Sequence, residues 1–110
     1  DVYKRQLQDI KPYLNNAGLT TVLWHMDDRR MMSSALAFLP VSNASGLPVT
    51  YTANLTSSEA PIEQIYKRHK KLKVNFLLSQ MQLPETFMLK NSCKEVFHNS
   101  FIHLYRFDEL

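Results

Sequence analysis

The stretch that decides the predicted fold is residues 61–83, which read PIEQIYKRHKKLKVNFLLSQMQL. Residues 56–60, directly before it, offer hydroxyl side chains that can cap a helix, and Pro61 suits a first helical turn. Pro84 disfavours helical geometry in the residue before it. On a helical wheel, His69 lies near the middle of one apolar face. The stretch therefore predicts one long amphipathic helix, the main packing partner of a sheet. The apolar face comprises Ile62, Ile65, Tyr66, Leu72, Phe76 and Leu77.

The segments on either side of this helix predict strands. Residues 20–26 and 31–41 are rich in strand-forming side chains and are separated by a polar turn, which indicates a hairpin. Residues 49–55 alternate apolar and polar side chains, the pattern of a strand with one buried face. Residues 87–90 form a shorter strand candidate. Residues 101–107 are apolar on both faces, so we expect this strand in the middle of the sheet.

Two shorter helices complete the prediction. Leu7, Ile10 and Leu14 fall at helical spacing, and residues 93–100 could form a turn of helix. The predicted fold class is α+β in two layers, with a four- to five-stranded, mainly antiparallel sheet packed on the long amphipathic helix. We interpret residues 1–6 as a non-native or truncated leader and residues 7–110 as a single α+β domain.

Composition excludes several classes of site. The 110-residue chain has two glycines, Gly18 and Gly46, and these are too few for the glycine-rich loops that cradle phosphates. A single cysteine, Cys93, cannot form a disulfide within the chain, and there is no Cys-x-x-Cys pair to hold zinc. We therefore expect no cofactor and no metal.

Hydropathy and cysteine usage suggest a location. The longest apolar runs are far shorter than the ~20 residues that a membrane helix needs, and no signal-peptide pattern opens the chain. We expect a cytoplasmic protein that does not associate with a membrane. A protein partner, a second copy of the chain and nucleic acid stay open as partners.

Positive charge is concentrated in the predicted helix. Residues 61–73 carry five basic residues and one acidic residue, whereas the whole chain has a net charge of +3. Such a surface could contact the phosphates of a nucleic acid or another polyanion. The alternative is an ordinary solvated helix face, since the charges spread over a broad arc. The candidate polyanion-binding residues are Lys67, Arg68, Lys70, Lys71 and Lys73.

The four histidines and the one cysteine are candidates for metal binding and for nucleophilic catalysis. The four histidines do not have the spacing of metal ligands on a helix. His25, His98 or His103 could act as a base for the Cys93 thiol, but the surrounding sequence matches no nucleophile motif. A lone cysteine is more often a small packing residue, so we assign no catalytic residue.

Large apolar side chains could line a pocket between helix and sheet, as in small sensory domains, or could simply pack the core. We therefore expect a non-enzymatic sensory or protein-interaction module of a larger or oligomeric protein. One alternative is a nucleic-acid-binding module that uses the basic helix 61–73, and another is a fragment of a larger enzyme. The candidate pocket residues are Trp24, Phe38, Tyr51, Tyr105 and Phe107.

Overall fold

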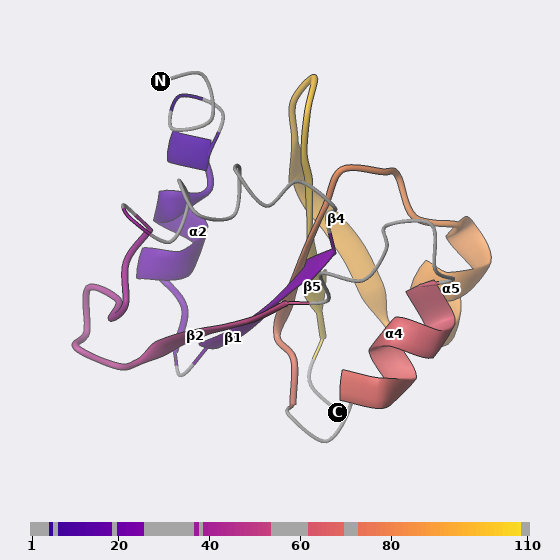
Figure 1. Cartoon of the computed structure of the whole chain (residues 1–110), viewed down its shortest axis with the longest axis horizontal. Coiled ribbons are helices and arrows are strands. Elements are labelled where there is room, and N and C mark those ends of the chain that lie inside the picture. The colour runs from indigo at the N-terminus through magenta and orange to yellow at the C-terminus, as the bar shows by residue number, and fades with distance from the viewer. Residues whose placement is uncertain are drawn as a thin grey trace.

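The computed structural model describes residues 5, 7–18, 20–25, 37, 39–53, 62–69 and 73–108, which form a five-stranded mixed sheet with helices on both faces (Figure 1). The strand order is β2-β1-β3-β5-β4. β1 pairs in parallel with both β2 and β3, and β5 pairs antiparallel with both β3 and β4. The strands are β1 (Thr20–His25), β2 (Val49–Ala53), β3 (Phe76–Ser79), β4 (Cys93–His98) and β5 (His103–Phe107).

The described helices are short. They are α2 (Lys11–Asn15), α4 (Ile62–His69) and α5 (Glu85–Lys90). Figure 1 shows α2 on one face of the sheet and both α4 and α5 on the other. Within the described residues, no helix is long and apolar enough to cross a membrane.

Each face of the sheet carries its own apolar core, because successive side chains of a strand point to opposite faces. The α2-side core contains Leu7, Ile10, Leu14, Val22, Trp24, Leu39, Val49, Phe76, Leu78, Ile102 and Leu104. The α4-side core contains Leu23, Ile62, Val74, Leu77, Leu83, Phe87, Cys93, Tyr105 and Phe107.

The prediction of one long helix over residues 61–83 is wrong. The helix α4 covers Ile62–His69, and β3 occupies Phe76–Ser79 in the second half of the stretch. Lys73, between them, has a left-handed φ of 53°, which a helix cannot contain. A parallel strand buried on both faces reads as a continuous apolar run, and periodicity alone cannot tell it from a buried helix.

The prediction of a mainly antiparallel, two-layer sheet is also wrong. The predicted strand 49–55 is present as β2, but it pairs in parallel with β1. Parallel neighbours need crossover connections of a dozen or more residues, and both the β1–β2 and the β2–β3 connections are longer than this. The predicted hairpin between residues 20–26 and 31–41 is wrong, because β1 has β2 and β3 on its two sides; most of residues 31–41 lies outside the described residues.

Two short segments exchange their predicted types. Residues 87–90, predicted as a strand, belong to α5, which has Pro84 at its N-cap and Glu85 in its first turn. Residues 93–98, predicted as part of a helical turn, form β4, where a register shift between Glu95 and Phe97 breaks the strand alternation. The interior position expected for the last strand is confirmed, because β5 lies between β3 and β4.

Candidate functional site

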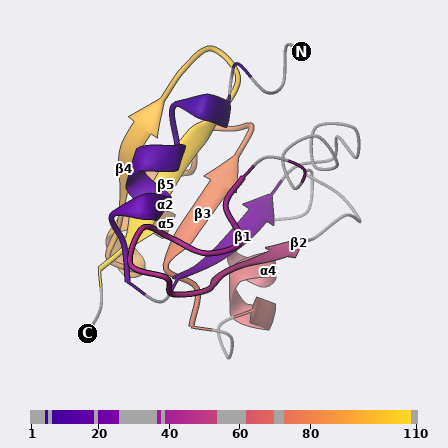
Figure 2. The ribbon, with the colours of Figure 1, turned by 90° about the vertical axis from the view of Figure 1, so that its left-hand side faces the viewer.

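A cavity of about 470 Å³ lies between α2 and the sheet, at the end where β1 and β3 begin. Its volume falls within the roughly 300–1,000 Å³ range typical of small-molecule sites. Figure 2, viewed from the α2 side, shows α2 in front of the β4–β5 part of the sheet. The lining residues are Pro12, Tyr13, Asn16, Ala17, Gly18, Thr20, Asn75, Phe76, Val96, Arg106 and Phe107.

The cavity exists because α2 is too short to cover the sheet. Its five residues span only about 7.5 Å at 1.5 Å per residue. Leu14 anchors the helix in the α2-side core, while Pro12 and Tyr13 face the cavity. The ring of Tyr13 also contacts Phe97 of β4, with centroids 6.0 Å apart. The helix is thus held over the strands with open space beside it.

Asn43 holds the cavity wall that Ala17 and Gly18 form directly after α2. This buried side chain donates from Nδ2 to the carbonyl oxygens of Ala17 and Gly18, at 2.6 and 2.9 Å. Its Oδ1 accepts hydrogen bonds from the backbone N–H groups of Ser45 and Leu47, at 2.9 and 3.0 Å. One amide therefore ties the cavity wall to a neighbouring loop. Such a wall is formed before any ligand arrives.

Asn75 fixes the opposite wall, just before β3. Its Oδ1 accepts a hydrogen bond from the backbone N–H of Thr21 at 2.9 Å. Its backbone N–H donates to the Thr21 carbonyl, and its carbonyl accepts from the N–H of Phe107, both at 2.9 Å. The side-chain amide is therefore held in a defined orientation. Among the described residues, its Nδ2 group makes no hydrogen bond, so it is available as a donor.

Arg106 supplies a positive charge to the cavity. It lies on β5, directly opposite Lys94 of β4 and Phe76 of β3. No carboxylate in the described part of the chain lies within ion-pair distance of its guanidinium group. The nearby carboxylate of Asp108 pairs with Lys94 instead, with Oδ1 3.9 Å from the Lys94 Nζ atom. The cavity thus combines apolar and neutral polar side chains with one cation that forms no ion pair in the described part of the chain.

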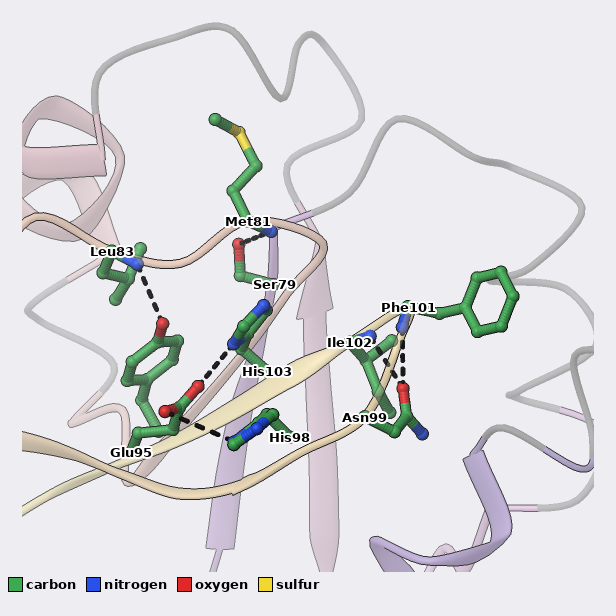
Figure 3. Close-up of polar contacts among 10 residues, drawn as sticks. Ser79, Met81, Leu83, Glu95, His98, Asn99, Phe101, Ile102 and His103 are labelled. Atoms are coloured by element: carbon green, nitrogen blue, oxygen red, sulfur yellow. Dashed lines mark hydrogen bonds and ion pairs between the residues drawn. The ribbon is translucent and has the colours of Figure 1, made fainter.

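A second polar cluster lies at the other end of the sheet, where β1 and β3 finish (Figure 3). Register places His25, Ser79, His103 and His98 side by side on four neighbouring strands. His25 Nδ1 lies 3.2 Å from Ser79 Oγ, which also accepts a hydrogen bond from the N–H of Met81 at 3.0 Å. These four residues are called the imidazole row below.

Glu95 joins His103 and His98 of the imidazole row. One carboxylate oxygen hydrogen-bonds to His103 Nδ1, and the other lies 3.6 Å from His98 Nδ1. The two rings stack with centroids 5.7 Å apart. The carboxylate of Glu95 thus fixes the orientation of the His103 ring through its Nδ1 atom. Within the described residues, no three His, Cys, Asp or Glu side chains are placed to hold a metal ion.

The predicted pocket residues do not gather around one space. Trp24 belongs to the α2-side core, and Tyr51 packs against it and donates to the Pro40 carbonyl at 2.8 Å. Tyr105 and Phe107 belong to the α4-side core on the opposite face, although Phe107 also lines the cavity. Phe38 lies outside the described residues.

The predicted polyanion-binding residues are only partly described. Lys67 is exposed on α4 and lines a hollow of about 450 Å³ between α4 and α5, with Glu63 and Lys90. Lys73 is exposed beyond the end of the helix. The side chain of Arg68 and the whole of Lys70 and Lys71 lie outside the described residues. A single basic helix 61–73 is not present, because α4 ends at His69.

Cys93 is poorly suited to nucleophilic chemistry. It lies in β4 and is 6% exposed, rather than at the start of a helix where a dipole could stabilise its thiolate. Burial, and secondarily the negative charge of Asp108, raise the pKa of its thiol to about 12. The thiol therefore stays protonated at neutral pH.

Sequence reasoning did not select Arg106 or Asn75. One signal in the sequence pointed to Arg106. It is a charged residue on the same face of the last predicted strand as the apolar Ile102 and Leu104. Comparison with protein-family models, curated proteins and solved structures found no match for this chain.

Proposed function

We propose that this domain is a non-enzymatic sensory module that binds a small molecule with an apolar body in the cavity between α2 and the sheet. The observation that carries this proposal is the preformed cavity of about 470 Å³, whose two walls are fixed by Asn43 and Asn75. Its apolar lining comes from Pro12, Ala17, Phe76, Val96 and Phe107.

Binding would connect α2 to the strands through the ligand. A ligand that binds only the folded state stabilises it by mass action, by about 2.7 kcal/mol at a concentration one hundred times its dissociation constant. A sensory role needs such coupling between occupancy and structure.

The test uses phenylacetamide as a neutral aromatic probe. We expect its chemical-shift titration to saturate with the natural chain. We expect no saturable binding with Ala17→Phe, because the added ring occupies the cavity from its own wall. Val41→Phe is the matched control, since Val41 is 75% exposed and does not line the cavity. Equal binding by both variants would contradict the proposal.

A further inference from the structure

We infer that the ligand of this cavity carries a carboxylate group, which Arg106 and Asn75 recognise together. This inference rests on the proposed function and adds the chemical class of the ligand. It assigns to these two side chains a role that apolar packing alone does not explain.

The first reason is the state of Arg106. Arg106 lines the cavity, and its guanidinium group has no carboxylate partner in the described part of the chain. A guanidinium group offers a planar fork of N–H donors that matches the two oxygens of a carboxylate. An unpaired fork beside apolar walls suits a ligand with an apolar body and an anionic end.

The second reason is the charge next to Arg106. Lys94 lies directly opposite it on β4, so two positive side chains occupy one cross-strand pair. Like charges in this position destabilise a sheet. Asp108 approaches Lys94 alone, at 3.9 Å, in an exposed position where such a pair contributes little. A bound anion would offset the repulsion that the protein itself leaves in place.

The third reason is the free donor of Asn75. Its Oδ1 accepts a hydrogen bond from the Thr21 N–H, and its Nδ2 group makes no hydrogen bond within the described residues. The guanidinium group of Arg106 and the Nδ2 group of Asn75 are thus two N–H donors of residues that line the cavity. A carboxylate accepts hydrogen bonds and donates none, so it complements both.

The experiment compares phenylacetate with phenylacetamide, which have the same shape and differ in charge. We expect phenylacetate to bind the natural chain at least tenfold more tightly, as measured by chemical-shift titration at constant ionic strength. In Arg106→Gln the two dissociation constants should become equal within about twofold. Arg106→Lys should keep part of the preference, because it retains the charge but not the planar fork.

Lys90→Gln is the matched control, since it removes an exposed positive charge of α5 that does not line the cavity. It should change the preference for phenylacetate by less than about threefold. If both probes bind with equal affinity and both are blocked by Ala17→Phe, the carboxylate inference fails and the proposed function stands. If neither probe perturbs the cavity residues, both fail.

Discussion

Cys93 and Arg106 show how burial and pairing set the chemistry of single residues in this sheet. Cys93 is buried in the α4-side core, and its surroundings favour the neutral thiol. Arg106 is exposed, lines a cavity and forms no ion pair within the described part of the chain. The sequence offered Cys93 as a candidate by its residue type alone. It could not show that Arg106 lines a cavity and makes no ion pair within the described residues, because these properties depend on strand register.

The raised pKa of Cys93 has a consequence for stability at high pH. In the unfolded chain the thiol ionises near its ordinary pKa of 9.0, whereas in the folded chain it ionises near 12. The unfolded state therefore loses its proton first, and the free energy of unfolding should fall as pH rises from about 9 to about 12. Burial also raises the pKa of Tyr105, to about 12, so part of the fall above pH 10 belongs to that side chain.

Urea unfolding between pH 8 and pH 10 measures this effect. Cys93→Ala should be less stable than the natural chain at pH 8, because a buried side chain is lost, but its stability should depend less on pH up to about 10. Alkylation of Cys93 by iodoacetamide should be slow in the folded chain and fast in urea. Rapid alkylation of the folded chain at neutral pH would contradict the assignment of an inert thiol.

Among the elements, the junction between α4 and β3 decides the topology of the sheet. The helical half of residues 61–83 was predictable, because Ile62 and Tyr66 repeat with helical spacing and contact the α4-side core. The second half was not, since Val74 to Leu78 is apolar in nearly every position and is compatible with either element. β3 lies between β1 and β5, so its strand character depends on partners that are distant in the sequence.

The substitution Lys73→Gly distinguishes a junction between helix and strand from a continuous helix, because the two arrangements predict opposite changes in the free energy of unfolding. The left-handed φ of 53° at Lys73 costs about 1–2 kcal/mol for a residue with a Cβ atom, whereas glycine adopts it without strain. Glycine also increases the conformational freedom of the unfolded chain, and this offsets part of the relieved strain. Lys73→Gly should therefore raise the free energy of unfolding by about 0.5–1 kcal/mol. In a continuous helix the same change would lower it by about 1 kcal/mol.

Gln64→Gly provides the helical comparison for chemical denaturation. Gln64 is exposed within α4, so glycine there should lower the free energy of unfolding by about 1 kcal/mol. Equal losses at both positions would mean that Lys73 is helical and that the described junction is wrong.

For the whole molecule, the mixed sheet separates two polar regions along the same strands. The cavity with Arg106 lies where β1 and β3 begin, and the imidazole row lies where they end. The sequence indicated an α+β fold and an interior final strand, both of which depend on local patterns. It could not indicate that Tyr13, Asn75 and Arg106 line one cavity, because these residues meet only through the packing of α2 on the sheet and the antiparallel pairing of β3 with β5.

A crystal structure of the chain with saturating phenylacetate would show whether this cavity holds a small carboxylate ligand. We expect the aromatic ring between Ala17 and Phe76, and the carboxylate against the Arg106 guanidinium group. An empty cavity at a concentration that saturates the titration, or phenylacetate bound at the imidazole row instead, would contradict the account.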